Sequence, residues 1–403
     1  MSADSALDRA PLHGFKDFYQ YATTTRVIAG RDLLESTGFE FLKEGASRVL
    51  LVTDPVIRST GLADKVEAGV VDGGLELVGV FDDVPQDSST AVVERCASAA
   101  EEAGADSFLA VGGGSVMDTA KVADAVFTHG GSAREQEGFL LMPREAGGMG
   151  RPLEIAPLAC IPTTAGTGSE ASMAAVIKDH QRKVKLEIAD FPLFPRLAIL
   201  DPECTRTLPA SVAAATGMDA MTHAIEGYVS NDWSAHGDAR SLHALRLIRD
   251  NLERAVERGE TDEEARGNML IAANLAITIA LGSVHAMSHS AGAHFGVPHG
   301  VANAIHLPHV IRHNAAGAAD IADRYREIGE LFGIDEPEIG DALADHITAL
   351  VGRLGLPTRL SQAGVPESGI PALVEGAMGD GTTLLNPREM GEEDYAELYR
   401  RAL

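Results

Sequence analysis

Between residues 49 and 111, short apolar runs alternate with helical patterns, and few folds accommodate that order. Val49–Asp54, Leu75–Phe81 and Ser107–Val111 are runs of mostly apolar residues. Such runs are typical of strands that are buried on both faces, as in a parallel sheet. Leu62–Val71 and Ser88–Ala103 instead have the spacing of helices. The order strand–helix–strand–helix–strand therefore predicts a doubly wound α/β domain.

The second of these predicted helices has recognisable ends. We expect Ser88 to cap its N-terminus, because a serine side chain accepts hydrogen bonds from the first free amides of a helix. Gly104 is expected to end the helix, since glycine adopts the left-handed conformation that closes many helices. Val92, Val93 and Cys96 line one face between these ends.

The rest of the chain divides into two parts of different character. The character changes after Pro202, and nearly every segment from Leu208 onward has helical periodicity, with glycine, asparagine or proline at the breaks. We therefore expect an α/β domain over residues 1–204 and an all-α domain over residues 205–403. Further strands of the first domain are expected at Leu158–Ile161 and Ala198–Asp201, with a hairpin of Ala174–Lys178 and Val184–Ile188.

The balance of charge limits the partners of the chain. It has 59 acidic and 33 basic residues in 403, which gives a formal net charge of −26. Such a surface repels phosphate backbones and anionic lipid headgroups, so neither nucleic-acid nor membrane partners are expected. The most apolar stretch, Met269–Ala286, contains polar residues, and we interpret it as a buried helix and not as a membrane span.

Cysteine usage and the N-terminus indicate the compartment. The three cysteines, Cys96, Cys160 and Cys204, are far apart and form no CxxC pair. This pattern predicts a reduced, cytoplasmic protein. The N-terminal residues have no basic segment followed by an apolar run, so no secretory signal is expected.

A glycine-rich loop follows the strand that ends at Val111. Its sequence, GGGSVMDTAK, covers Gly112–Lys121 and opens a helix. Glycines such as Gly113 and Gly114 permit close approach of a pyrophosphate to backbone amides at the positive end of the helix dipole. Ser115 can donate a further hydrogen bond. The alternative is a plain strand-to-helix turn, since the loop is not the G-x-G-x-x-G fingerprint.

A second loop of similar character, Thr163–Glu170, also follows a predicted strand. Two such loops at the carboxyl ends of strands in one sheet fit a bound dinucleotide. Asp54 ends another strand, where a carboxylate can accept hydrogen bonds from an adenosine ribose and repels a 2′-phosphate. This favours NAD over NADP, although Asp54 could simply form a turn.

Histidines gather near the middle of the second domain. Six of the 14 lie between Gly282 and His309. His285 and His289 are four residues apart, so they share one face of a helix. His299 follows a Gly-Val-Pro turn that could fold it back over that face. Imidazole is a common ligand of divalent transition metals.

Asp219 and His223 supply a second pair with helical spacing. They lie four residues apart on an otherwise apolar stretch, where polar side chains are costly unless they are paired or bind a ligand. A hydrogen bond between the two is one explanation. With His285 and His299, they also form a set of one carboxylate and three imidazoles. That set suits Fe(II) or Zn(II) with an open position for substrate.

Four of these segments together resemble a known family. GGGSVMDTAK, TTAGTGSE, DAMTHAIEGY and GSVHAMSHSAGAHFGVPHGVANAI are similar to motifs of the iron-containing (group III) alcohol dehydrogenases, and occur in the order of that family. The similarity extends from about Phe15 to the C-terminal NPREMGEEDYAELY. It implies a nucleotide-binding α/β domain followed by a helical domain, a fold shared with dehydroquinate synthase.

The resemblance also implies roles for individual residues. The metal ligands would be Asp219, His223, His285 and His299, and His289 would lie beside the nicotinamide. The cofactor-binding positions would be Asp54, Gly113, Gly114, Ser115, Asp118, Thr163, Thr164, Thr167 and Lys185. His294, His306, His309 and His313 match no ligand position of the family.

The implied reaction is hydride transfer between NAD(H) and a small alcohol, aldehyde, hydroxyacid or oxoacid. The metal, most simply Fe(II) with Zn(II) as an alternative, acts as a Lewis acid on the substrate oxygen, and His289 relays the proton. Other hypotheses are a hydroxyacid–oxoacid transhydrogenase that retains its NAD, a lyase like dehydroquinate synthase, and a scaffold without a working metal centre. The resemblance further suggests a homodimer.

Overall fold

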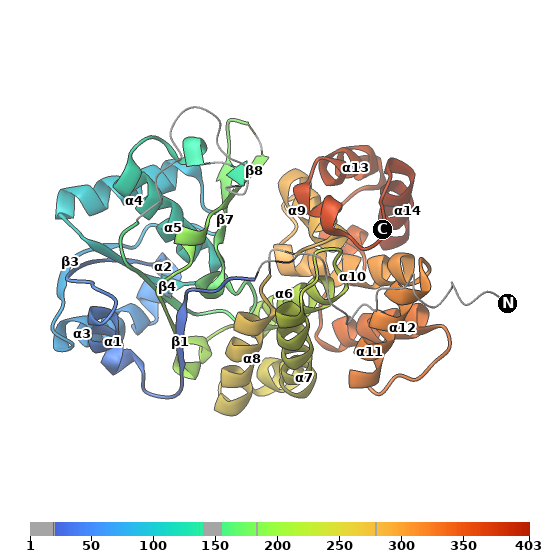
Figure 1. Ribbon diagram of the computed structural model, residues 1–403, viewed down its shortest axis with the longest axis horizontal. Coiled ribbons are helices and arrows are strands. Elements are labelled where there is room, and N and C mark those ends of the chain that lie inside the picture. The colour runs from blue at the N-terminus through green and yellow to red at the C-terminus, as the bar shows by residue number, and fades with distance from the viewer. Residues whose placement is uncertain (1–18, 20, 137, 140–154, 183, 279) are drawn as a thin grey trace. The chain divides into compact units, whose positions relative to one another are not determined.

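The protein is described by a computed structural model, which covers residues 19, 21–136, 138–139, 155–182, 184–278 and 280–403. The chain forms two compact units. We call Thr23–Ala220 with Asp250–Ile279 the sheet unit, and Met221–Arg249 with Ala280–Leu403 the helical unit, in each case for the described residues. Figure 1 shows strands and helices in the former and helices in the latter. The proposed domain division near residue 205 stays a prediction.

A six-stranded parallel sheet forms the centre of the sheet unit. Every neighbouring pair is parallel, and the strand order is β1-β9-β6-β4-β2-β3. The chain passes from β2 to β3 on one side and then to β4 on the other, so the direction of winding reverses between β2 and β4. The strands are β1 (Arg26–Ala29), β2 (Arg48–Val52), β3 (Glu76–Phe81), β4 (Ser107–Gly112), β6 (Leu158–Pro162) and β9 (Leu197–Leu200).

Both faces of this sheet are covered, which explains why its strands are apolar throughout. Leu50 and Phe108 belong to one buried cluster, together with residues of α4 and α5. Leu51 and Leu109, the next residues along β2 and β4, belong to a second cluster with residues of α3. The predicted doubly wound α/β fold is therefore confirmed. The helices of the first part are α1 (Thr37–Leu42), α2 (Pro55–Ser59), α3 (Leu62–Asp72), α4 (Thr90–Ala103) and α5 (Gly114–His129).

A small second sheet contains the predicted hairpin. Strands β7 (Ala174–Asp179) and β8 (Val184–Ala189) pair antiparallel, with Lys178 opposite Lys185. The short strand β5 (Gly138–Phe139) adds to β8 in parallel. Contacts between α5 and β7 hold this sheet to the rest of the unit.

Two ionisable side chains of α5 are buried within the sheet unit. Nζ of Lys121 donates hydrogen bonds of 2.8 Å to the carbonyl oxygens of Ser172 and Ala174. Oδ1 of Asp124 accepts bonds from the Thr128 hydroxyl and the backbone amide of Ala156. Burial raises the pKa of Asp124 to about 8, because the charged form is poorly solvated there.

The helical unit is built from long helices that pack on α10. The main contacts of α10 are with α9 and α12, while α13 packs on α9 and α14. Helices α6 and α7 each contribute residues to both units, because the division of the chain falls within them, after Ala220 and after Arg249. The helices are α6 (Ala210–Val229), α7 (Ala235–Arg258), α8 (Glu263–Ala276, in the sheet unit), α9 (Ser283–Phe295), α10 (His299–Ala315), α11 (Ala319–Leu331), α12 (Ile339–Arg353), α13 (Ile370–Met378) and α14 (Glu392–Ala402).

Two expectations about helices are wrong. The N-cap of α4 is Ser89 and not Ser88, because the hydroxyl of Ser88 is 2.6 Å from that of Thr119 and ties the loop to α5. The apolar stretch Met269–Ala286 is not one helix: α8 ends at Ala276 and α9 begins at Ser283. Within the described residues, no helix combines the length and apolar character needed to cross a membrane. The predicted lack of a secretory signal concerns residues 1–18, which lie outside the described ranges.

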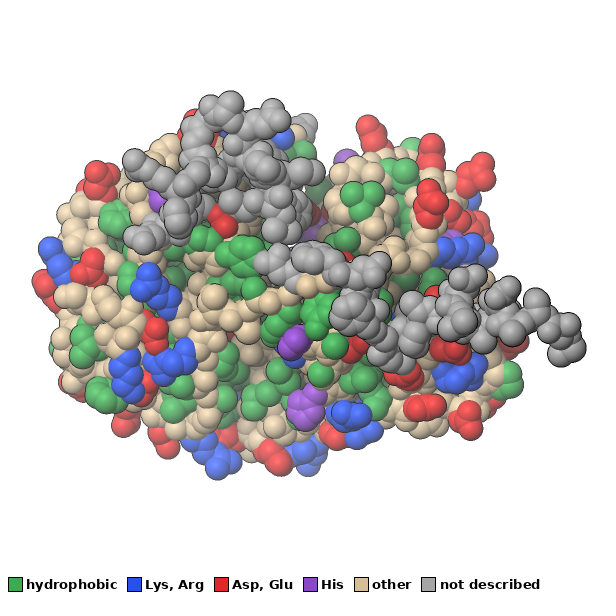
Figure 2. All heavy atoms as spheres, in the orientation of Figure 1, with side chains coloured by type: hydrophobic (Ala, Val, Ile, Leu, Met, Phe, Trp, Pro, Cys, Tyr) green, Lys and Arg blue, Asp and Glu red, His purple; other side chains and the backbone are tan. Residues whose placement is uncertain are grey.

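The cysteines are unpaired, as expected from the sequence, and charged side chains of both signs lie on the surface (Figure 2). Cys96, Cys160 and Cys204 are free thiols in the buried interior of the sheet unit. Burial, with a smaller contribution from Asp124, raises the pKa of Cys96 to about 12. On the face drawn in Figure 2, acidic and basic side chains are mixed over the surface.

Candidate active site

Helix α6 carries the first two candidate ligands. Asp219 and His223 are one helical turn apart and almost fully buried, with 2% and 5% of their surface exposed. Their neighbours Met218, Ala220 and Met221 belong to the apolar interior. The helical spacing predicted from the sequence is therefore present, since α6 is continuous from Ala210 to Val229.

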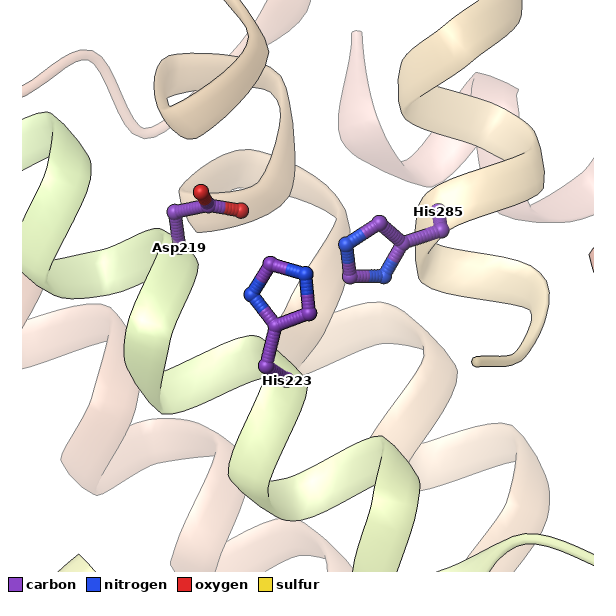
Figure 3. Close-up of side chains that lie close together, drawn as sticks. All are labelled: Asp219, His223 and His285. Carbon is purple, nitrogen blue, oxygen red and sulfur yellow. The ribbon is translucent and has the colours of Figure 1, made fainter. Parts of the chain in front are cut away.

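His285 on α9 completes a compact group with this pair. The ring centroids of His223 and His285 are 4.6 Å apart. Asp219, His223 and His285 each offer a ligand atom, and these atoms all lie within 4.8 Å of one another. Figure 3 shows Asp219 and His223 on one helix and His285 on another, with the His223 ring between the other two side chains. One carboxylate and two imidazoles at this separation are suited to a transition metal ion.

His299 is brought beside this group by the turn that the sequence predicted. Gly296 ends α9 in the left-handed conformation, and His299 is the first residue of α10 after Pro298. Its ring centroid is 5.3 Å from that of His285 and 5.3 Å from that of His289. The side-chain amide of Asn303 lies 3.2 Å from Nε2 of His299. His299 thus lies next to Asp219, His223 and His285, but it is not one of the residues whose ligand atoms all lie within 4.8 Å of one another.

Glu226 is a residue of the site that the sequence reasoning missed. It is one turn beyond His223 on α6 and 4% exposed. Its Oε2 lies 2.5 Å from Nδ1 of His285, and its Oε1 accepts a 2.7 Å bond from the backbone amide of Val284. With Nδ1 donating to the carboxylate, the lone pair of the His285 ring is on Nε2, the other ring nitrogen. Carboxylates commonly orient metal-binding histidines in this way.

His289 is held by a second carboxylate that the sequence reasoning also missed. Nδ1 of His289 lies 2.8 Å from Oδ2 of Asp380. Oδ1 of Asp380 accepts bonds from the backbone amide and the hydroxyl of Thr382. Burial alone would raise the pKa of Asp380, but His289 and Thr382 outweigh it and lower that pKa to about 2. Asp380 is therefore an acceptor at neutral pH and fixes the orientation of the His289 ring.

The other histidines of α10 have different surroundings. Nδ1 of His306 lies 3.1 Å from the hydroxyl of Ser288. Burial lowers the pKa of His306 to about 3, so this side chain is neutral. Burial, together with nearby arginines, lowers the pKa of His309 to about 4. Neither residue lies in the group around His285, which agrees with their lack of a matching ligand position.

The glycine loop leads directly from β4 into α5. Gly113 is the N-cap of α5, and the helix begins at Gly114. A Cβ added at Gly114 would lie 2.9 Å from Cγ2 of Thr167, and one added at Gly113 would lie 3.5 Å from Cγ2 of Thr164. The two loops predicted to bind a nucleotide are thus in contact, and Gly114 lacks the room for a side chain. The amide of Thr163 also bonds the carbonyl oxygen of Gly112 at 3.0 Å.

Asp118 and Ser115 connect these loops to their neighbours. Oδ1 of Asp118 accepts a 2.6 Å bond from the hydroxyl of Ser169, and Oδ2 accepts one from the amide of Val176. Burial raises the pKa of Asp118. The Ser115 hydroxyl accepts a 3.2 Å bond from the amide of Asp87. Asp118 thus joins the helix after the glycine loop to the threonine loop and to β7.

The hydrogen bonds of Asp54 and the ion pair of Lys185 are with residues outside the two loops. Asp54 follows β2 and caps α2, because its Oδ1 accepts bonds of 2.8 and 2.9 Å from the amides of Val56 and Ile57. This is the turn-forming role that was the alternative to ribose binding. Lys185 is on β8, and its Nζ lies 3.9 Å from Oδ1 of Asp87. Since β2, β4 and β6 are adjacent, Asp54 and both loops lie at one edge of the sheet.

A parallel sheet with glycine- and threonine-rich loops at the ends of its strands, together with a histidine–carboxylate group on helices, is typical of nucleotide- and metal-dependent oxidoreductases. The family can be stated more closely. Residues 24–202 match the iron-containing alcohol dehydrogenase family, and residues 213–403 match the C-terminal part of the Fe-containing alcohol dehydrogenase family. The chain belongs to this family and is an NAD-dependent alcohol dehydrogenase of the iron-containing type.

Individual relatives extend over almost the whole chain. An NAD-dependent methanol dehydrogenase of Bacillus methanolicus is 34% identical over 385 residues, which cover 93% of this chain and 97% of that enzyme. The crystal structure of a 1,3-propanediol oxidoreductase superposes with a TM-score of 0.87 at 33% identity, covering 96% of this chain and 100% of the other. A sulfoacetaldehyde reductase from Bifidobacterium kashiwanohense, solved with NAD+, has a TM-score of 0.83 at 28% identity, covering 96% and 98%.

Proposed function

We propose that Asp219, His223, His285 and His299 bind one divalent metal ion, and that the enzyme uses it to interconvert a small alcohol and its aldehyde with NAD(H). The observation that carries this proposal is the group of ligand atoms within 4.8 Å of one another on α6 and α9. The donor set of one carboxylate and three imidazoles accepts Fe(II) and Zn(II). The iron-containing character of the family favours Fe(II).

NAD is proposed to bind at the edge of the sheet where β2, β4 and β6 end. Gly113, Gly114 and Ser115 would hold the pyrophosphate with backbone amides at the N-terminus of α5. The hydroxyls of Thr163, Thr164 and Thr167 and the ammonium of Lys185 would complete the contacts. Asp118 contributes by fixing the threonine loop through Ser169. Asp54 would exclude a 2′-phosphate, which favours NAD over NADP.

The protein's own residues prepare the reaction in defined ways. When bound, the metal supplies Lewis acidity that lowers the pKa of a substrate hydroxyl, and NAD+ supplies the hydride acceptor. Asp380 holds Nδ1–H of His289, so the neutral ring has its lone pair on Nε2, which can take up the hydroxyl proton. Glu226 holds His285 in the tautomer that leaves Nε2 able to bind a cation.

The substrate class is proposed as a small primary alcohol or diol. The methanol dehydrogenase and the 1,3-propanediol oxidoreductase among the relatives support this class. A second candidate is a hydroxyacid, either oxidised with release of NADH or used in transhydrogenation with retained NAD. Net release of NADH distinguishes a dehydrogenase from a transhydrogenase.

The test is anaerobic purification with metal analysis, followed by NADH formation on a panel of small alcohols, diols and hydroxyacids, with NAD and NADP compared. We expect one equivalent of divalent metal, activity with NAD on short alcohols, and loss of both metal and activity in Asp219→Ala. Metal content unchanged by Asp219→Ala would contradict the ligand assignment. Silence of the metal-loaded enzyme across the panel would contradict the substrate class.

We further propose a homodimer in the cytoplasm, with nucleotide binding by residues 1–204 and metal binding by residues 205–403. The reduced state of Cys96, Cys160 and Cys204 supports a reducing compartment. Light scattering of the purified enzyme tests the dimer, and a single-chain mass would contradict it. Cell fractionation tests the location.

A further inference from the structure

We propose that a hollow in the helical unit, separate from the metal-binding group, binds a small oxyanion through arginine side chains. The hollow has a volume of about 230 Å³ and lies between α10, α12, α14 and the segment around residue 359. Arg312 of α10, Arg359 and Arg401 of α14 contribute three guanidinium groups to its wall. Guanidinium groups match phosphate and carboxylate groups geometrically, because two parallel N–H bonds can be made at once.

Cationic groups outnumber acidic ones in this wall, although acids prevail in the chain as a whole. Asp345 is the acidic residue among the described residues that line the hollow, and it pairs with Arg312. Arg401 pairs with Glu397 at 2.8 Å. Arg359 has no ion pair with any residue in the described part of the chain. In a protein with 59 acidic and 33 basic residues, three arginines around one small hollow form a local site of opposite charge.

Polar groups without charge add hydrogen-bonding capacity to the wall. Thr348 and Thr358 contribute hydroxyl groups, and His309 contributes an imidazole. Burial first, and then Arg312, Arg401 and Arg359, lower the pKa of His309 to about 4. The imidazole is therefore neutral at pH 7 and can donate one hydrogen bond to an anion. The influence of all three arginines on His309 agrees with a positive potential inside the hollow.

The size and position of the hollow limit its ligand. A water molecule occupies roughly 30 Å³ in the liquid, so the hollow has room for about seven or eight waters. That space suits inorganic phosphate or a short dicarboxylate. His309 is ten residues beyond His299 on α10, which places it about 15 Å further along the helix axis. The ligand is thus not the substrate of the proposed metal site.

Adjacent residues of α14 provide a matched test. Arg400 and Arg401 both pair with Glu397, and their side chains are 59% and 57% exposed. Of the two, Arg401 lines the hollow. Calorimetric titration of the full-length enzyme with inorganic phosphate, and separately with succinate, at constant ionic strength would compare Arg400→Gln with Arg401→Gln. Both variants have the same net charge, so a difference between them reports the local contact.

We expect binding of phosphate or succinate to weaken about tenfold in Arg401→Gln and to stay unchanged in Arg400→Gln. The anion that binds shows whether the site takes phosphoryl or carboxylate groups. If the anion were instead held by a metal ion, its affinity would change equally in both variants, so this outcome differs from the expected one. Absence of binding by both anions, or equal weakening in both variants, would overturn the proposal.

Arg359→Gln gives a second measurement that does not disturb an ion pair of the described residues. Because the Arg359 side chain is exposed, we expect its replacement to leave the thermal unfolding temperature unchanged. Binding of the same anion should again weaken about tenfold. An unchanged affinity in a variant that is fully folded would overturn the assignment of the site to this hollow.

Discussion

Replacement of Glu226 by glutamine should weaken metal binding, although the two side chains have nearly the same shape. The Glu226 carboxylate accepts two hydrogen bonds, from Nδ1 of His285 and from the amide of Val284. Glutamine has a single oxygen and an NH2 group. If the oxygen keeps the bond from Val284, the NH2 group faces His285 and requires Nδ1 to accept. The ring proton then moves to Nε2, and that nitrogen can no longer bind a cation.

The expected magnitude follows from this change of tautomer. Loss of a carboxylate or amide partner of a metal-binding histidine typically weakens metal affinity about 10- to 100-fold. This corresponds to roughly 1.4–2.7 kcal/mol of binding free energy at 25 °C. Glu226→Ala should have a further effect on folding, because the Val284 amide and the His285 ring would both lose a buried acceptor at about 1–3 kcal/mol each.

Competition of the metal-free protein against a chromophoric chelator measures the affinity without recourse to activity. Glu375→Gln, an exposed acid of the same unit, removes the same charge and should leave the affinity unchanged. Thermal unfolding of the metal-free variants checks that the fold is intact. A metal affinity of Glu226→Gln within twofold of the unmodified protein, with normal folding, would refute the role of Glu226 as the orienting partner of His285.

Three further outcomes are expected. Gly114→Ala should weaken NADH binding about tenfold in a fluorescence titration, since its Cβ would lie 2.9 Å from Thr167 Cγ2, whereas Gly352→Ala, which meets nothing within 4 Å, should not. Asp124 has a raised pKa, so the native state loses stability as pH rises from about 4 to 8. The free energy of unfolding of Asp124→Asn, measured in urea, should therefore rise relative to that of the unmodified protein by about 1.4 kcal/mol per pH unit between pH 5 and 7. A difference that stays constant with pH would contradict this. Lys121→Met should lower the free energy of unfolding by about 3 kcal/mol, because two buried carbonyl oxygens lose their donor, and a change below 1 kcal/mol would contradict that account.

Most of the fold could be predicted because its strands and helices have strong local signals. β2 and β4 are buried on both faces, so they are apolar throughout and stand out from the amphipathic helices between them. The wrong expectations concern the ends of helices, which are set by tertiary contacts and not by the local sequence pattern. Ser88 and Ser89 are equally suitable caps by composition, and only the contact of Ser88 with Thr119 separates them. The apolar pattern also continues across the break at Ile277, where the backbone becomes extended.

The candidate site could be predicted as far as helical spacing extends. Asp219 and His223 share a face of α6 because they are four residues apart, and the turn at Gly296 returns His299 toward α9. The residues that orient these histidines were missed for a different reason. Glu226 lies on α6 but its carboxylate contacts His285 on α9, and Asp380 is 91 residues from His289 along the chain. No local pattern connects such partners, since only the packing of separate helices brings them together.

The burial of the cysteines offers a way to follow the opening of one unit alone. Cys96 on α4, Cys160 on β6 and Cys204 after β9 all belong to the sheet unit, and the helical unit has no cysteine in its sequence. A thiol reagent can react only when these positions become exposed, as in local or global unfolding. The rates of modification, resolved residue by residue by mass spectrometry, would therefore report how often the sheet unit opens, with and without NAD, and no cysteine of the helical unit would contribute to the signal.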